Sequence, residues 1–118
     1  MSKTYFSLGL MSGTSMDGVD ASIIQSDGEK KYKTVIDKYF EYPKDIYENL
    51  VKFRYKIKIT KDLKKFSKEL SIIEKKITLF HVKAANEILR LSNTDIDFIG
   101  FHGQTIFHNP NEKITKQL

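Results

Sequence analysis

The sequence predicts an α/β domain in which an antiparallel three-stranded meander is followed by helices and then by a parallel central strand. Three observations predict this fold class. Residues 5–42 contain three runs rich in β-branched and aromatic residues, separated by turns that contain glycine. Residues 61–91 carry apolar side chains three or four positions apart, which is the spacing of one helical face. Residues 96–101 form a short apolar run, and a helix between two strands makes a crossover to a parallel strand.

The three meander strands are expected at residues 5–11, 19–25 and 32–42. An Asp-Gly pair supplies the hairpin signal between the second and the third. Apolar and polar residues alternate imperfectly in the third strand, which predicts a bulge or an irregular register. Pro43 then ends the meander, because proline has no backbone N–H to donate to a neighbouring strand.

The segment after the meander predicts a short helix over residues 45–55. Residues 56–59 alternate strictly between lysine and isoleucine, a pattern that suits either a short strand or a linker. We favour the linker, with Thr60 as the N-cap of the next helix.

An uninterrupted helix over residues 61–91 would be long for a small domain, so we expect a break near Ser67 or Ser71. The regular apolar spacing alone would also suit a coiled coil. A wider apolar face fits packing on a sheet better than a two-helix seam, and sheet packing is therefore favoured. Three side chains widen the face in the second half of the helix: Val82, Ala85 and Leu89.

The composition limits the possible classes of protein. The 118 residues suit one domain at most, and the absence of cysteine excludes disulfides and cysteine-based metal sites. No apolar run is long enough for a membrane span and no signal peptide is recognised, so we expect a cytoplasmic protein without a membrane partner. The net charge is +5, but only Arg54 and Arg90 are arginine and the lysines alternate with acids along the predicted helices. This pattern favours a solvated lysine-rich surface over a nucleic-acid interface.

Residues 9–20 (GLMSGTSMDGVD) join the first two predicted strands through a glycine-rich turn. Glycine lets the backbone approach a ligand closely, and successive amides in such a turn can form an anion-binding nest. Thr14 and Ser15 add hydroxyl donors, and Asp17 is suited to hold Mg²⁺ directly or through water. The turn is neither a Walker A loop nor a dinucleotide fingerprint. An ordinary hairpin with a long polar turn remains the alternative.

A second candidate, residues 99–110 (IGFHGQTIFHNP), follows the predicted strand at 96–101, which we expect to be buried. Ligands of open α/β sheets bind at such strand ends. His102 and Gln104 share a face if the strand continues. A lone histidine is usually a core or turn imidazole, and we interpret His81 in that way. A zinc site from His102 and His108 is not expected, because no third ligand stands at a useful spacing.

These two stretches resemble the signatures of the anhydro-N-acetylmuramic acid kinase family, in the right order. A phosphate loop between two strands is similar to that of the actin-like ATPase and sugar-kinase superfamily, whose ribonuclease-H-like core has the same order of elements. The resemblance implies ATP-dependent phosphorylation, with Mg²⁺, and hydrolytic ring opening of 1,6-anhydro-N-acetylmuramic acid to N-acetylmuramic acid 6-phosphate in cell-wall recycling.

The resemblance also implies roles for particular residues. The residues that match the ATP-phosphate loop are Gly13, Thr14, Ser15, Met16, Asp17, Gly18, Val19 and Asp20, with Asp17 as the metal residue. The residues that would contact the sugar or its lactyl carboxylate are His102, Gln104 and His108. Phe101 departs from the family, which often has a small residue there, and would narrow the site.

The resemblance covers the whole chain, but the chain corresponds only to the first part of a family member. We therefore expect residues 1–118 to be the N-terminal part of a kinase-like ATPase domain, with the second domain, the catalytic aspartate and the adenosine-binding glycines outside this chain. No catalytic residue is assigned. One hypothesis is a kinase whose missing part comes from a partner chain. The others are a non-catalytic remnant of a split or decaying gene, and a lysine-rich helical interaction module, which leaves both motifs unexplained.

Overall fold

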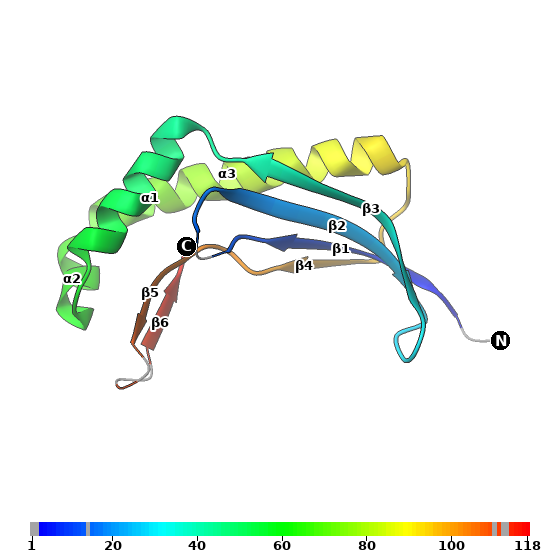
Figure 1. Ribbon diagram of the computed structural model, residues 1–118, viewed down its shortest axis with the longest axis horizontal. Coiled ribbons are helices and arrows are strands. Elements are labelled where there is room, and N and C mark those ends of the chain that lie inside the picture. Colours follow the sequence, from blue (N-terminus) through cyan, green and yellow to red (C-terminus); the bar gives the residue numbers. More distant parts are fainter. Residues whose placement is uncertain (1–2, 14, 110, 112–113) are drawn as a thin grey trace.

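The computed structural model describes residues 3–13, 15–109, 111 and 114–118 and shows an α/β fold with a mixed sheet. Four strands form the main sheet in the order β3-β2-β1-β4, and a separate hairpin carries β5 and β6 (Figure 1). Three helices lie between β3 and β4 in the chain, and α3 runs along one face of the sheet. The strands of the main sheet are β1 (Tyr5–Met11), β2 (Gly18–Ser26), β3 (Tyr32–Glu41) and β4 (Phe98–Phe101).

Strand pairing confirms the predicted meander and its crossover. β1 pairs with β2, and β2 with β3, in antiparallel fashion, whereas β4 pairs with β1 in parallel. The register between β2 and β3 shifts between Ile23 and Ile24, which confirms the predicted irregularity. The backbone N–H of His102 donates to the Leu10 carbonyl at 3.2 Å and extends the β1–β4 contact beyond the end of β4.

The helices are α1 (Lys44–Lys56), α2 (Thr60–Lys65) and α3 (Ser67–Ser92). Phe66 separates α2 from α3, so the break expected near Ser67 is confirmed, and the segment between α1 and α2 is a linker rather than a strand. The N-cap prediction is wrong by one residue. α2 begins at Thr60, and the Asp62 carboxylate accepts the backbone N–H groups of Lys58 and Ile59, which stabilises the start of the helix.

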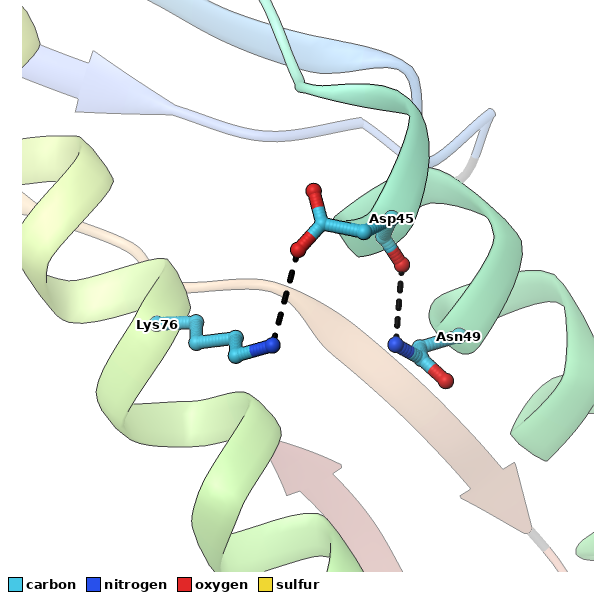
Figure 2. Close-up of polar contacts among 3 residues, drawn as sticks. All are labelled: Asp45, Asn49 and Lys76. Carbon is cyan, nitrogen blue, oxygen red and sulfur yellow. Dashed lines mark hydrogen bonds and ion pairs between the residues drawn. The ribbon is translucent and has the colours of Figure 1, made fainter.

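One ion pair links α1 to α3 on the surface. Lys76 Nζ lies 3.5 Å from Asp45 Oδ2, while Asn49 Nδ2 donates to the Asp45 carbonyl at 2.9 Å (Figure 2). Both charged side chains are largely exposed, so the pair contributes little to stability. The packing of the two helices therefore depends on apolar burial.

The core lies between α3 and one face of the sheet. Leu8, Val19 and Ile23 are fully buried on the strands, and Ile77 and Ile88 cover them from α3. This arrangement confirms that the apolar helical face packs on a sheet and does not form a coiled coil. The widened face is only partly used: Ala85 and Leu89 are half-buried, whereas Val82 is exposed.

The prediction that the strand near residues 96–101 is buried and central is wrong for this chain. β4 is the edge strand of the sheet, and Phe98, Ile99 and Phe101 are 57%, 63% and 54% exposed. The physical reason is the position of α3, which packs mainly over β2 and β3 and leaves most of β4 uncovered. Burial of this strand depends on strand order and helix placement, and its own composition does not decide it.

The last two strands, β5 (Thr105–Asn109) and β6 (Ile114–Gln117), form a small antiparallel hairpin that the sequence patterns did not predict. Gly103 has φ +81, a conformation that favours glycine, and it marks the point where the chain leaves the main sheet. Backbone hydrogen bonds in both directions between Gln104 and Leu118 close the hairpin at its base. Within the described part of the chain, no helix is both long and apolar enough to cross a membrane.

The helix–sheet interface generates a stability prediction. Ile77→Ala should lower the free energy of unfolding by roughly 2–5 kcal/mol, because it removes a fully buried side chain and leaves a cavity. Ile72→Ala is the matched control on the same helix, since Ile72 is 56% exposed and should change stability by less than about 1 kcal/mol. Urea unfolding followed by circular dichroism measures both, and equal losses would contradict the packing of α3.

Candidate functional site

The glycine-rich turn between β1 and β2 is a tight loop with an unusual backbone at Met16. The Met16 N–H donates to the Gly13 carbonyl at 3.2 Å, and Met16 has φ +62. A positive φ costs a residue with a side chain roughly 1–2 kcal/mol. The Met16 side chain is only 3% exposed, so its burial in the core offsets that cost.

Glycine is present at the two ends of the turn, Gly13 and Gly18, for different structural reasons. A Cβ at Gly18 would collide with the Phe40 carbonyl oxygen and the Tyr39 hydroxyl, so this glycine allows β2 to pack closely against β3. Gly13 is exposed, and the nearest atom to a Cβ there would be Ser15 Oγ at 3.8 Å. Of these two glycines, Gly13 is therefore the one whose backbone is exposed.

Asp17 is an exposed carboxylate held in one orientation. Its Oδ1 accepts hydrogen bonds from Tyr39 Oη at 2.7 Å and Ser15 Oγ at 2.8 Å, and the Tyr39 bond is the main cause of a lowered pKa at Asp17. Burial, followed by the contact with Asp17, raises the pKa of the Tyr39 hydroxyl, which stays protonated as a donor. Both bonds use Oδ1, so neither engages Oδ2.

A pocket of ≈ 220 Å³ lies beside Asp17 at the N-terminal end of α1. Lys44 lines it together with Tyr42 and Tyr47, so a cation stands next to the carboxylate. The Lys44 ammonium pairs with Glu48 at 3.8 Å, but both side chains are well exposed and this pair is weak. The pocket is thus lined by two acids, Asp17 and Glu41, and by one cation, Lys44.

A buried polar cluster lies directly beneath the turn. Ser12 Oγ lies 2.8 Å from Tyr42 Oη and 3.3 Å from His81 Nε2, and Tyr42 Oη donates to Gln104 Oε1 at 3.2 Å. Gln104 Nε2 donates to the Gly13 carbonyl at 2.9 Å. The four side chains are between 0% and 4% exposed, so the cluster joins the turn, the end of β3, α3 and the segment after β4 inside the core.

His81 is the core imidazole that the sequence analysis expects. Its Nδ1 lies 2.8 Å from the Ile77 carbonyl, so Nδ1 carries a proton, and its ring packs edge-on against Phe101 at a centroid distance of 4.9 Å. Burial lowers the pKa of His81, and the facing titratable group is Tyr42 rather than a carboxylate. The ring is therefore neutral near physiological pH.

The structure separates His102 from Gln104. They were expected to share a face if the strand continued, and that condition is not met, because β4 ends at Phe101 and the chain turns at Gly103. His102 is exposed, whereas Gln104 is fully buried with its amide used inside the protein. His108 lies elsewhere, on β5, where Nδ1 contacts Thr115 Oγ1 at 2.6 Å.

His102 lines a hollow of ≈ 510 Å³ on the face of the sheet away from α3. Gly9, Asp20, Gly100 and Phe101 line the same hollow. The hollow is mainly apolar, with one acid and one imidazole at its rim. His108 lines a different pocket of ≈ 160 Å³ with Met16 and Arg54.

The residues predicted for the phosphate loop divide into three groups. Gly13, Ser15 and Asp17 are exposed at the turn, and Thr14 lies outside the described residues. Asp20 is exposed in the hollow that also contains His102. Three residues are buried and can offer only their backbone to a ligand: Met16, Gly18 and Val19.

The donor set fits phosphate with one metal ion better than a metal held by protein alone. Among the described residues, no three His, Cys, Asp or Glu side chains gather to hold an ion. Mg²⁺ commonly uses one or two carboxylates, phosphate oxygens and water, and Asp17 beside a hydroxyl donor meets that need.

The sequence analysis did not identify Ser12, Tyr39 or Tyr42 as site residues. Ser12 lies inside the glycine-rich motif, next to Gly13, and this position could have identified it as a site residue. Tyr39 and Tyr42 carried no signal, because strand pairing brings them to the turn from 22 and 30 positions away in the chain.

Comparison with known proteins identifies the same family at each level of similarity. A model of the family described as "Anhydro-N-acetylmuramic acid kinase" matches residues 5–118. A protein of that name from Pelagibacter ubique is 59% identical over 118 residues, which are 100% of this chain and 32% of the relative. Those from Agrobacterium fabrum and Brucella canis are each 36% identical, and the matches cover 32% and 31% of those relatives. The chain thus spans about a third of the length of the curated relatives it matches.

The buried imidazole generates a pH prediction. Because the folded pKa of His81 lies below its ordinary value of 6.5, the unfolded state binds more protons as the pH falls through 6.5, and stability is lost in that direction. The His81→Gln variant should be less stable than the natural chain at neutral pH, and this difference in stability should shrink as the pH is lowered. Thermal midpoints measured across this range test it, with exposed His108→Gln as control. A difference between the midpoints that is constant with pH would contradict it.

Proposed function

Because this chain belongs to the anhydro-N-acetylmuramic acid kinase family, we propose that it supplies the ATP-phosphate-binding part of such a kinase. The family resemblance implies the reaction: ATP-dependent phosphorylation of 1,6-anhydro-N-acetylmuramic acid with hydrolytic ring opening, giving N-acetylmuramic acid 6-phosphate. The observation that carries the proposal is the turn between β1 and β2, where an open glycine, a hydroxyl and an oriented carboxylate stand together.

Gly13 and Ser15 would face the phosphates of ATP, and Asp17 would hold Mg²⁺ directly or through water. When bound, the metal ion neutralises charge on the phosphates and so favours transfer of the terminal phosphoryl group. Tyr39 keeps the Asp17 carboxylate in place through its 2.7 Å hydrogen bond, so the acid does not need to be ordered when the nucleotide arrives. Lys44 is a further candidate for a phosphate contact, because it lines the pocket beside Asp17.

His102 is the best supported of the proposed sugar-binding residues. It is exposed beside a hollow large enough for part of a sugar, and Asp20 at the same rim offers an acceptor for hydroxyl groups. Phe101 also lines this hollow, but its ring packs against His81 on α3, so a site narrowed by Phe101 stays a prediction. Gln104 and His108 stay predictions as sugar ligands, since Gln104 is buried and His108 lines a separate pocket.

We further propose that the domain has the ribonuclease-H-like core of the actin-like superfamily. The strand order, with a parallel strand beside an antiparallel meander, supports this assignment. The relatives are about three times longer than the matched segment, so the catalytic base, the adenosine site and the second domain are assigned to sequence beyond these residues, in the same or a partner chain. The proposed cofactors are ATP and Mg²⁺, and the proposed location is the cytoplasm.

The proposal is tested by placing residues 1–118 in the Pelagibacter ubique relative, in exchange for the third that they match. We expect this chimera to form ADP in a reaction that depends on the anhydro sugar. Absence of turnover from a folded chimera would contradict a kinase role and favour the non-catalytic remnant.

In the same chimera, Asp17→Asn should lower turnover at limiting Mg²⁺ by an amount equivalent to roughly 1–3 kcal/mol, because it removes a charge beside the metal. Asp37→Asn, an exposed acid on β3, is the matched control and should leave turnover unchanged. Asparagine serves ordinary turns as well as aspartate does. Equal activity of the natural and Asp17→Asn chimeras would therefore show that the loop is only a turn.

A further inference from the structure

We propose that Gln104, Tyr42 and Ser12 form a brace that turns the Gly13 carbonyl into the protein and keeps the loop in the shape that receives phosphate. On this view Gln104 is a positioning residue, and this role replaces the sugar contact predicted for it. The inference rests on the proposed phosphate-binding role of the loop, and it concerns how that site is built.

The orientation of the Gln104 amide follows from its neighbours. Its Nε2 lies 2.9 Å from the Gly13 carbonyl oxygen and 3.3 Å from the Thr105 carbonyl oxygen. Carbonyl oxygens only accept hydrogen bonds, so the NH₂ group must face them. The Gln104 Oε1 then faces Tyr42 Oη at 3.2 Å and must accept its proton. The amide cannot be reversed without placing three acceptors against one another.

The rest of the brace follows from the count of protons. Tyr42 has one hydroxyl proton and gives it to Gln104, so in the 2.8 Å contact with Ser12 the tyrosine oxygen accepts. Ser12 also has one proton, which it gives to Tyr42, so the 3.3 Å contact between Ser12 Oγ and the unprotonated His81 Nε2 carries no proton. Each donor therefore has a defined use. Removing one hydroxyl would leave a buried acceptor unpaired, which is costly where water cannot replace it.

The brace has a direct consequence for an incoming anion. The Gly13 carbonyl accepts both the Gln104 amide and the Met16 N–H, and Gln104 is fully buried. The negative end of this peptide dipole is thus directed into the core, away from the exposed side of the loop. A carbonyl released from Gln104 could rotate outward and repel a phosphate oxygen, because like partial charges repel strongly at short range.

The brace also holds the backbone at Met16. The turn places Met16 at φ +62, which is unfavourable without support, and the Met16 N–H to Gly13 carbonyl bond closes that turn. The Gln104 amide is the second donor to the Gly13 carbonyl. Its loss should loosen the turn without unfolding the domain. Amide hydrogen exchange at Met16 therefore reports on the brace without any ligand.

The test uses the 118-residue chain with two brace variants. Tyr42→Phe removes the hydroxyl that Gln104 accepts, and Gln104→Glu replaces the NH₂ group that faces two carbonyls. Exchange at Met16 is measured by NMR, and affinity for tripolyphosphate with Mg²⁺ by titration. We expect roughly tenfold faster exchange and roughly tenfold weaker affinity in both variants, as for the loss of one buried hydrogen bond.

Two controls separate positioning from general destabilisation. Tyr55→Phe makes the same chemical change at a side chain that is 73% exposed. Ile88→Val weakens the core without touching the brace, and it should lower stability while leaving tripolyphosphate affinity within twofold of the natural chain. Brace variants that lose affinity only as much as Ile88→Val does would overturn the positioning role.

The remaining outcomes are also decisive. Unchanged exchange at Met16 in both brace variants would overturn the brace itself. Faster exchange with unchanged tripolyphosphate affinity would leave the cluster purely structural and overturn the positioning role. If the natural chain fails to bind tripolyphosphate, the proposed function of the loop fails, and the brace is still judged by the exchange rates.

Discussion

The parallel pairing of β4 with β1 determines where the two sequence motifs meet. The register sets Leu10 beside Phe101, and the His102 N–H then donates to the Leu10 carbonyl. From this point Gly103, with its positive φ, lets the chain turn beneath the glycine-rich loop. Gln104 can reach the loop only because of this pairing. A shift of one residue would reverse the faces of the strand and carry the amide away from the core.

A polar cluster beneath a phosphate-loop candidate is costly to bury, and hydrogen bonds among its members offset that cost. Ser12, His81 and Gln104 are the buried polar residues among those described, and each has a hydrogen-bond partner. Apolar side chains of the same size would favour stability but could not define the direction of a carbonyl. The cluster therefore contributes less apolar burial than apolar side chains would, but it fixes the direction of the Gly13 carbonyl. A preorganised anion site needs such a fixed backbone.

Local patterns predicted the elements, whereas tertiary placement decided the site. β1, the register irregularity at Ile23 and the break beside Ser67 followed from spacing and composition, because the signal for each lies within one segment of sequence. The exposure of β4 and the burial of Gln104 did not, since they depend on strand order and on the position of α3. Asp17 was recognised from its motif, but its partner Tyr39 arrives through pairing of distant strands.

The geometry also constrains how phosphate and sugar sites could be arranged. Asp17 immediately precedes β2 and Asp20 lies on it, and the two side chains line different pockets. Asp17 lies beside the N-terminal end of α1, and Asp20 lies with His102 in the hollow on the uncovered face. β1 and β4 both end at one edge of the sheet, at Met11 and Phe101, and these two residues line the hollow that contains Asp20. Ligands of open sheets bind outside the carboxyl ends of parallel strands, and this edge is continuous with the segment that carries Gln104, so the proposed phosphate and sugar sites would meet beside the brace.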